Sequence, residues 1–351
     1  MEKAGPFRLY FVFRYSFFFV AWFHAINYQC SANAEDLVAV QSLSKELLKT
    51  KKTKQGEHPW VERAIAQGFE ERFALHDLPI RAWVRQGQNQ MPAPDDIATP
   101  DIENYQQGDP IGAPMGDPTS DRQSATYRKK HFVVMIESDG ASWKSAGYLS
   151  PRDPTPIEPI GLMMALLTPV GDHVLYLARL CQFLKPDRLA PRACEDNRWW
   201  TSWRFSSEIV QTYHRIILKY ATEFPENRVV LAGFSGGGSL AALIAARIAE
   251  GGANNSLCLI TMASPLDLNE WTNHHRLSPL KGLPDATSLK QSLIGLPAAY
   301  AFGVADRKVP FESAGVFLSE PAWIEKVHKY KDLKHNADWV KLWPELLRKA
   351  C

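Results

Sequence analysis

A serine among glycines stands at residues 233–237, where the sequence is Gly-Phe-Ser-Gly-Gly. The apolar run Arg228–Leu231 precedes it, and residues 239–248, rich in alanine and leucine, follow it. This order predicts a strand, a sharp turn and a helix, with Ser235 at the turn. The glycines let strand and helix pass close together, so the serine hydroxyl is exposed. The N–H of Gly236 would then stabilise a negatively charged oxygen at the helix start.

The alternative interpretation of these glycines is a turn that binds a phosphate. In a phosphate-binding loop of that kind a lysine follows the glycines, and here Ser239 and an apolar run follow instead. The sequence therefore favours a nucleophile beside an anion site.

A serine hydroxyl is a weak nucleophile unless a base removes its proton, and histidine suits that role near neutral pH. In hydrolases with this turn, the acid and then the histidine follow the serine along the chain. Asp306 comes after the apolar run Ala298–Phe302 and is the predicted acid, with Asp267 as the second candidate. The predicted base is His335, which lies in a loop before the last predicted helix, and His328 is its rival.

A second oxyanion donor is expected in the loop after an early strand. Residues 137–140, Glu-Ser-Asp-Gly, directly follow an apolar run, so the backbone N–H of Asp139 or of Gly140 is the predicted donor. A free Asp139 carboxylate would oppose the oxyanion, so it must turn away or pair, with Arg179 or Arg276 as partner. The alternative is an ordinary Asp-Gly turn.

Apolar runs alternate with helical segments along most of the chain. Strands are predicted within 72–85 and at 131–136, 174–178, 228–231, 257–262 and 298–302, and helices at 160–167, 205–224, 239–248 and 338–350. This alternation predicts an α/β fold with a mostly parallel central sheet flanked by helices, over residues 70–351. Residues 86–127 are rich in Pro, Asp, Gln and Gly, which predicts a surface insertion, or alternatively a lid over the site.

Composition narrows the classes of function. The 351 residues carry a formal net charge of +2, and 22% of them are charged, which gives no electrostatic footprint for nucleic-acid binding. The sequence has neither a Cys-x-x-Cys pair nor a histidine cluster with zinc-ligand spacing. We therefore expect no metal and no cofactor.

The N-terminal segment, residues 1–34, has the pattern of an export signal. Basic residues precede the apolar stretch Tyr15–Ile26, and Ala32-Asn-Ala34 offers a cleavage site. We expect a periplasmic or secreted protein whose residues 35–69 form a helical extension. The alternatives are an uncleaved segment that anchors the protein to a membrane, or a lipid on Cys30, which the bulky residue before it disfavours.

Four cysteines follow this segment: Cys181, Cys194, Cys258 and Cys351. An oxidising compartment permits disulfides, and four cysteines allow three pairings. Cys181–Cys194 would close a short polar loop and is the favoured pair. Cys258 lies in an apolar run and is expected to be a buried free thiol.

Together these motifs resemble the α/β-hydrolase superfamily, and more narrowly a group of uncharacterised bacterial exported α/β hydrolases. The resemblance rests on residues 136–143, 176–183, 194, 200–205, 233–238, 268–275, 303–306 and 334–340. It implies that Ser235, Asp306 and His335 form a triad and that Cys181 and Cys194 are neighbours. Ser138 stands where that group usually has glycine.

The function predicted first is a serine hydrolase that cleaves an acyl ester or thioester through an acyl-enzyme on Ser235. Its partner would be a small-molecule acyl substrate, and tryptophans at 143, 199, 200, 203 and 271 are candidates to line an acyl pocket. The alternatives are a non-catalytic exported binding protein with the same fold and an acyltransferase with the same triad.

Overall fold

The computed structural model describes residues 57–73, 79–88, 130–142, 153–184, 192–225, 227–252, 256–284, 286–314, 318, 320–336 and 338–351. All of them belong to the unit Leu48–Cys351. The predicted export signal, residues 35–56 of the extension and residues 89–127 of the insertion lie outside the described residues, so these predictions stay predictions.

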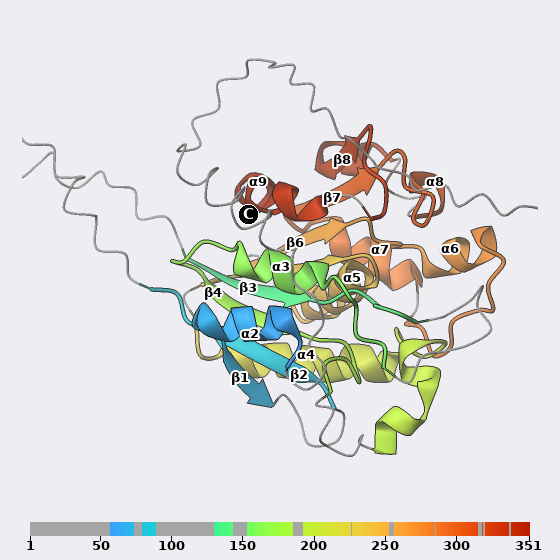
Figure 1. The fold of residues 1–351 in the computed structure, drawn as a ribbon. Helices are drawn as coiled ribbons and strands as arrows, with labels where there is room; N and C mark the ends of the chain where they lie inside the picture. The colour runs from blue at the N-terminus through green and yellow to red at the C-terminus, as the bar shows by residue number, and fades with distance from the viewer. Residues whose placement is uncertain are drawn as a thin grey trace, which may run out of the picture. The chain divides into compact units, whose positions relative to one another are not determined.

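Eight strands of the described residues form one sheet, in the order β1-β2-β4-β3-β5-β6-β7-β8 (Figure 1). The strands are β1 Glu70–Phe73, β2 Arg81–Arg85, β3 His131–Ile136, β4 His173–Leu177, β5 Arg228–Phe234, β6 Leu257–Met262, β7 Ala298–Gly303 and β8 Val327–Tyr330. Strand β2 is antiparallel to both of its neighbours, and every other pair is parallel. The mostly parallel sheet predicted from the sequence is therefore confirmed.

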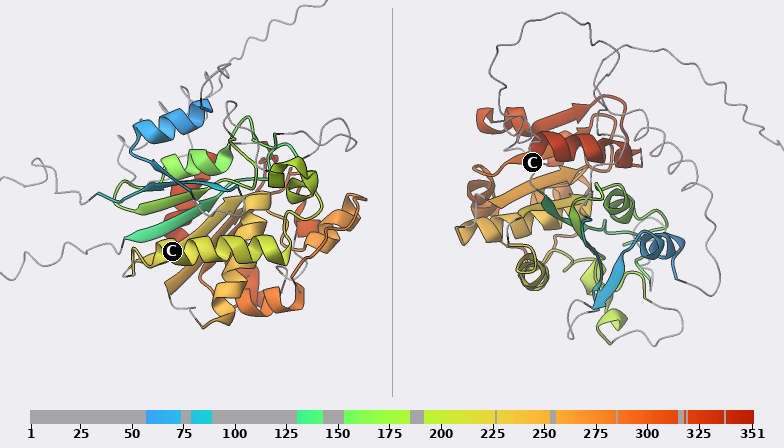
Figure 2. Two further views of the ribbon diagram at one scale, coloured as in Figure 1. Left: turned by 90° about the horizontal axis from the view of Figure 1, so that it is seen from below. Right: turned by 90° about the vertical axis from the view of Figure 1, so that its left-hand side faces the viewer.

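Helices cover both faces of the sheet (Figure 2). One face carries α4 Ser207–Ala221, α5 Gly236–Glu250 and α7 Ala286–Leu293, and the other carries α2 Pro59–Ala66, α3 Ile160–Leu166 and α9 Trp343–Ala350. The shorter helices are α6 Leu268–His274, α8 Phe311–Ala314, η4 Arg192–Glu195, η5 Asn197–Trp200, η8 Pro321–Lys326 and η9 Trp339–Leu342. With helices on both sides, β3, β6 and β7 are buried along their whole length, which explains their unbroken apolar sequences.

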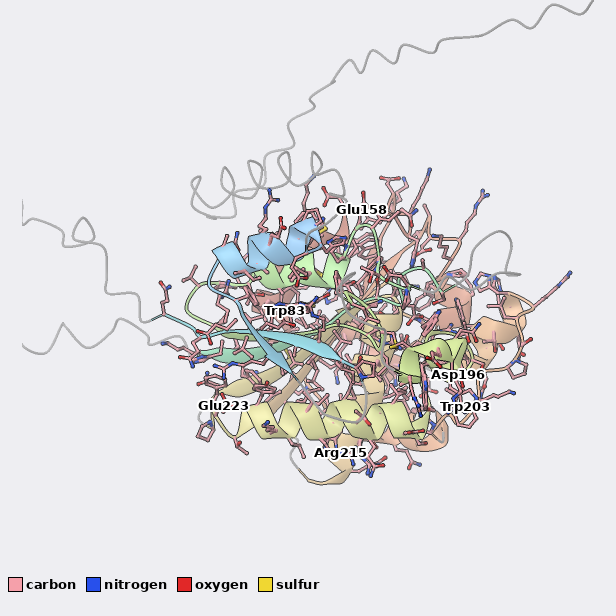
Figure 3. All side chains as sticks on the ribbon, turned by 60° about the horizontal axis from the view of Figure 1, so that its bottom comes forward. Trp83, Glu158, Asp196, Trp203, Arg215 and Glu223 are labelled. Atoms are coloured by element: carbon pink, nitrogen blue, oxygen red, sulfur yellow. A yellow bond between two sulfur atoms is a disulfide. The ribbon has the colours of Figure 1, made fainter. Side chains whose placement is uncertain are left out.

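Helix α4 shows how an amphipathic pattern places side chains. It begins after Ser206, whose hydroxyl accepts a hydrogen bond from Ile209 N (3.4 Å) and so caps the first turn. Arg215 of α4 and Glu223 just beyond it lie on the outer side of this layer, whereas Trp83 of β2 lies on the α2 side of the sheet (Figure 3). Trp83 is fully buried there.

One local prediction needs correction. The helical extension predicted for residues 35–69 ends in α2, which is not a polar surface helix, because it buries Trp60, Val61 and Ala64 beside α3 over the sheet.

The polar, strand-like stretch around His328 is the edge strand β8, which pairs in parallel with β7. Its sequence is polar because an edge strand is only partly buried.

Two disulfides cross-link the described residues. Cys181 and Cys194 are bonded, as predicted, with Cα atoms 5.7 Å apart. The prediction of a free thiol at Cys258 is wrong, because this residue is bonded to Cys351, with Cα atoms 5.9 Å apart. Cys258 is buried as expected, but α9 carries the last residue of the chain over β6 and so supplies a partner.

No helix in the described part of the chain is long and apolar enough to cross a membrane. The same residues contain no group of three or more His, Cys, Asp or Glu side chains that could hold a metal ion.

Candidate active site

Ser235 stands at the sharp turn between β5 and α5. Its backbone angles are φ 54° and ψ −129°, a conformation that costs energy for any residue with a Cβ. Its N–H donates to Met262 O (2.8 Å), which holds the turn against the neighbouring strand. A Cβ on Gly233 would collide with the Gly237 backbone, and a Cβ on Gly237 with the carbonyl of Ile136. The glycines are therefore required by close backbone approach, and Ser235 is partly exposed while its immediate neighbours are buried.

Asp306 and His335 lie at the corresponding edge of the sheet, after β7 and β8. The Nδ1 atom of His335 is 2.8 Å from Oδ2 of Asp306. The other oxygen of Asp306 accepts hydrogen bonds from the backbone N–H of Lys308 (2.8 Å) and Val309 (2.9 Å). Burial alone would raise the pKa of Asp306, but the His335 contact and the two amides outweigh it, so the pKa lies below its usual value. An ionised Asp306 holds the proton of His335 on Nδ1 and leaves Nε2 as the basic atom.

The imidazole of His335 packs beside the turn that carries Ser235. Its ring centroid is 5.1 Å from that of Phe234, the residue before the serine. Trp339 also contacts Phe234, with ring centroids 6.1 Å apart, and its indole N–H donates to Lys334 O (3.0 Å). The loop that carries His335 is thus held against the end of β5 on both sides of the histidine.

The rival acid and base have structural roles in this arrangement. Asp267 caps α6, because its carboxylate accepts a hydrogen bond from Glu270 N (2.9 Å). His328 lies within β8, where its backbone pairs with Ala301, and burial lowers the pKa of its ring. Asp306 and His335 are the acid and the histidine that the fold brings together.

The loop at residues 137–140, called the oxyanion loop after its predicted role, leaves the end of β3 and packs against the residue after the serine. A Cβ on Gly236 would collide with the Asp139 carboxylate, so the loop and the start of α5 are in close contact. The Ser138 N–H donates to Glu137 Oε1 (2.8 Å) and is therefore occupied. Gly140 has φ 62°, in the left-handed region that suits glycine, but residues 137–140 form no hydrogen-bonded turn, so the alternative of an ordinary Asp-Gly turn is not what this loop adopts.

Two arginines neutralise the Asp139 carboxylate. Arg179 NH1 is 2.6 Å from Oδ1, and Arg204 Nε is 2.8 Å from Oδ2. The pairing with Arg179 was predicted, while the second partner is Arg204 and not Arg276. Desolvation lowers the pKa of Arg204, although the nearby Asp139 charge opposes that shift. One carboxylate between two guanidinium groups leaves a formal charge of +1, so this cluster does not repel a developing oxyanion.

Glu137 is a fully buried carboxylate that the sequence reasoning did not single out. It accepts hydrogen bonds from the N–H groups of Ser138 (2.8 Å), Gly161 (3.3 Å) and Leu162 (3.0 Å) and from the Tyr176 hydroxyl (2.9 Å). Desolvation raises its pKa, against the opposing effect of these donors. Glu137 thereby joins the oxyanion loop to the start of α3 and to β4.

The loop that carries Asp306, called the acid loop, also contacts α6 and the residue after it. Lys308 O lies 2.8 Å from Trp271 Nε1 and 2.8 Å from His275 Nε2. Lys308 Nζ donates to Asn336 Oδ1 (3.2 Å), so the same residue links the acid loop to the histidine loop. Trp271 thus has a positioning contact, and Trp199 and Trp200 are buried. Trp203 is partly exposed, and the Arg198 guanidinium lies 5.7 Å from its ring centroid. Trp143 is outside the described residues.

Sequence reasoning missed Glu137, Arg204 and Gln182, whose side chains hold the oxyanion loop. Gln182 and Arg204 lie in segments that carry the resemblance, but nothing local gives either residue a role, because the partner of both is a loop far earlier in the chain. Glu137 could have been noticed, since a glutamate directly after a fully apolar strand is an unusual place for a charge.

The candidate catalytic residues all follow strands of one sheet. One mostly parallel sheet carries a serine turn after β5, an acid after β7 and a histidine after β8. The protein has the α/β-hydrolase fold. The sequence model of the lipase (class 3) family matches residues 188–275, a part of the chain that includes Ser235 and α5.

Several solved structures are similar to this chain. An acylaminoacyl peptidase from Pyrococcus horikoshii has a TM-score of 0.45 and 12% identity over 84% of this chain and 44% of that chain. An alpha-beta serine hydrolase homologue from Coxiella burnetii has a TM-score of 0.44 and 13% identity over 80% of this chain and 97% of that chain. A carboxylesterase from Lactobacillus plantarum has a TM-score of 0.39 and 16% identity over 80% and 94%. The chain thus spans less than half the length of the peptidase, and comparison with curated proteins gives no match.

Proposed function

We propose that this protein is a serine hydrolase that cleaves an acyl ester or thioester through an acyl-enzyme on Ser235. The observation that carries the proposal is the Asp306–His335 pair, 2.8 Å apart, packed against Phe234 beside the serine turn. The match of residues 188–275, which contain the serine turn, to the lipase (class 3) family supports the same class of reaction.

The proposed reaction uses each group at a stated atom. Ser235 Oγ attacks the acyl carbonyl while His335 Nε2 takes the hydroxyl proton, and Asp306 stabilises the imidazolium that forms. The N–H of Gly236 and an N–H of the Asp139–Gly140 segment hold the oxyanion. His335 returns the proton to the departing alcohol or thiol, which leaves the acyl group on Ser235. Water then attacks the acyl-enzyme while His335 Nε2 takes its proton. His335 returns that proton to Ser235 Oγ as the acid leaves.

Labelling with a fluorophosphonate tests the nucleophile. We expect the wild type to be labelled and Ser235→Ala to be unlabelled and to hydrolyse chromogenic esters at least about 10⁴-fold more slowly. Ser207→Ala is the matched control, because this exposed hydroxyl at the start of α4 donates to Gly282 O (3.2 Å), away from the Asp306–His335 pair. Equal labelling of wild type and Ser235→Ala would refute the proposal.

An acyl-chain series on the same esters measures the size of the acyl site. If the wild type is labelled but releases acid slowly, adding an alcohol or amine acceptor shows whether the acyl group goes to an acceptor other than water. A folded wild type that neither reacts with the probe nor turns over any ester would instead behave as a binding protein.

We also propose that the protein is exported. Both disulfides are consistent with an extracellular location, because such bonds persist in oxidising compartments. The export signal itself rests on the sequence pattern of residues 1–34.

A further inference from the structure

We propose that Gln182 is a positioning residue that turns the backbone N–H of Asp139 toward the oxyanion. The juxtaposition that suggests this role is the side-chain amide of Gln182 against the carbonyl of Ser138, in the loop beside Ser235. The inference rests on the proposed hydrolase function and extends it to a residue that does not touch the substrate.

The direction of the Asp139 N–H follows from peptide geometry. The peptide between Ser138 and Asp139 is trans, so the Ser138 carbonyl and the Asp139 N–H point in opposite directions. Gln182 Nε2 donates to Ser138 O at 2.9 Å. In the sheet β3 lies between β4 and β5, and the loop after β3 is contacted by Gln182, which follows β4, and by Gly236, which follows β5. Because the carbonyl is held on the β4 side, the N–H is directed to the β5 side, where Gly236 lies.

The neighbouring amides of this loop are already occupied. The N–H of Ser138 donates to Glu137 Oε1 (2.8 Å), and that of Ala141 donates to Pro154 O (3.1 Å). Among the described residues, the N–H groups of Asp139 and Gly140 donate to no protein acceptor. The Gln182 contact selects Asp139 between these two, because it sets the orientation of the peptide that carries the Asp139 N–H.

The Gln182 side chain has one arrangement available to it. It is fully buried, and its Oε1 accepts a hydrogen bond from the backbone N–H of Arg179 (2.9 Å). With the oxygen committed to a donor, the NH₂ group must face acceptors, and it finds Ser138 O at 2.9 Å and Pro154 O at 3.4 Å. Arg179 also pairs with the Asp139 carboxylate, so the same segment holds both ends of Asp139.

The backbone around Gln182 is strained on both sides. Cys181 has φ 65° and Phe183 has φ 56°, in the left-handed region that residues with a Cβ rarely occupy. The segment is anchored by Cys181 N to Pro79 O (3.1 Å), by Phe183 N to Thr155 Oγ1 (2.6 Å) and by the Cys181–Cys194 disulfide. Backbone strain of this kind persists only where the surrounding structure imposes it, and here the strained backbone places the Gln182 side chain against the oxyanion loop.

Two substitutions of similar volume test the role. Gln182→Met and Gln182→Leu both remove the amide group that donates to Ser138 O. We expect kcat on a chromogenic ester to fall about 10- to 10³-fold in both, up to the effect of removing one oxyanion donor, with KM within about twofold. Affinity for an alkyl boronic acid, whose adduct on Ser235 presents an oxygen in the oxyanion site, should fall in parallel with kcat/KM.

Ile217→Ala is the control for lost stability. It opens a cavity at a buried side chain near the end of α4, where Phe224 contacts Phe132 and His173 at the starts of β3 and β4, so it lies at the sheet edge opposite the serine turn. We expect kcat and boronate affinity to stay at the wild-type level. Unchanged kcat in a folded Gln182 variant would overturn the inference, and so would a loss confined to KM. If neither variant folds, the wild-type boronate adduct decides: the inference requires Asp139 N within about 3 Å of the adduct oxygen and fails if another loop amide is there instead. An inactive wild type would refute the hydrolase function itself, which is a separate result.

Discussion

Two aspartates stand close to Ser235, and their surroundings give them different roles. Asp306 is buried, accepts two backbone N–H bonds and contacts His335, which keeps it ionised as an orienting acid. Asp139 lies between Arg179 and Arg204, so its charge is compensated beside the proposed oxyanion site. The residue type alone does not distinguish these roles; the number and kind of donors around each carboxylate do.

Asp306→Asn tests the role of the acid. We expect kcat to fall about 10⁴-fold at neutral pH, because asparagine cannot hold the proton on Nδ1 of His335 and stabilise the imidazolium. The folded-state pKa of Asp306 is depressed, so the stability that its ionised form contributes is present above the usual aspartate pKa and is lost as pH falls through the folded-state pKa. The difference in free energy of unfolding between wild type and variant, measured by urea titration, should therefore be largest near neutral pH and shrink in acid. A difference independent of pH would contradict this account of Asp306.

At the scale of elements, the ends of parallel strands bring the site together, and helices packed across the sheet hold it in place. Helix α9 follows the His335 loop and is attached at two points. Its Trp343 donates to Thr168 Oγ1 beyond α3 (3.0 Å), and the residue after it, Cys351, is bonded to Cys258 in β6. The base is thus carried by a segment with both ends tied to the rest of the fold, since Phe234 and Trp339 pack at its other end.

Removal of the Cys258–Cys351 disulfide should lower stability more than activity. The bond closes a loop with a sequence separation of 93, and a loop of that length contributes about 4 to 5 kcal/mol in the chain-entropy account. We expect the double variant Cys258→Ala, Cys351→Ala to lose a free energy of unfolding of that order by urea titration, while its kcat stays within a few-fold of wild type well below the melting temperature. Wild-type stability in the variant would show that the bond does not constrain the fold.

At the scale of the whole molecule, the two disulfides and the sequence pattern of residues 1–34 belong to the same interpretation. One bond joins Cys181 to Cys194 beside the oxyanion loop, and the other joins Cys258 of β6 to Cys351 after α9, so the geometry of the site is that of the oxidised chain. In a cytoplasm that keeps thiols reduced, neither disulfide would form.

Mass spectrometry tests the proposed export. A chain expressed in bacteria with its own N-terminal segment 1–34 should be recovered outside the cytoplasm with Glu35 as its first residue. Unfolded without reductant, it should have no cysteine that reacts with an alkylating reagent, and after reduction four. The matched control is the chain begun at Glu35 and kept in the cytoplasm, where we expect alkylation without reduction. A retained leader on the exported chain, or a free thiol in it, would contradict the proposal.

Most elements and the candidate triad could be predicted because their signals are local or ordered along the chain. Buried parallel strands are apolar throughout, the elbow needs glycines at set positions, and the acid and base follow the serine in sequence. Edge strand β8 gave a weaker signal, since only part of it is buried. The extent of burial of α2 was missed because it depends on what packs beneath the helix rather than on its own composition.

The amino-acid sequence by itself therefore determined the class of fold, the serine turn and the order of acid and base, and it favoured the Cys181–Cys194 pair. Only the tertiary structure decided that Arg204 pairs with Asp139, that Gln182 holds the Ser138 carbonyl and that Cys258 has a partner. The physical reason is the sequence separation over which each interaction acts. Periodicity and turn chemistry act over a few residues, whereas these contacts join segments that only the order of strands and the packing of α9 bring within bonding distance.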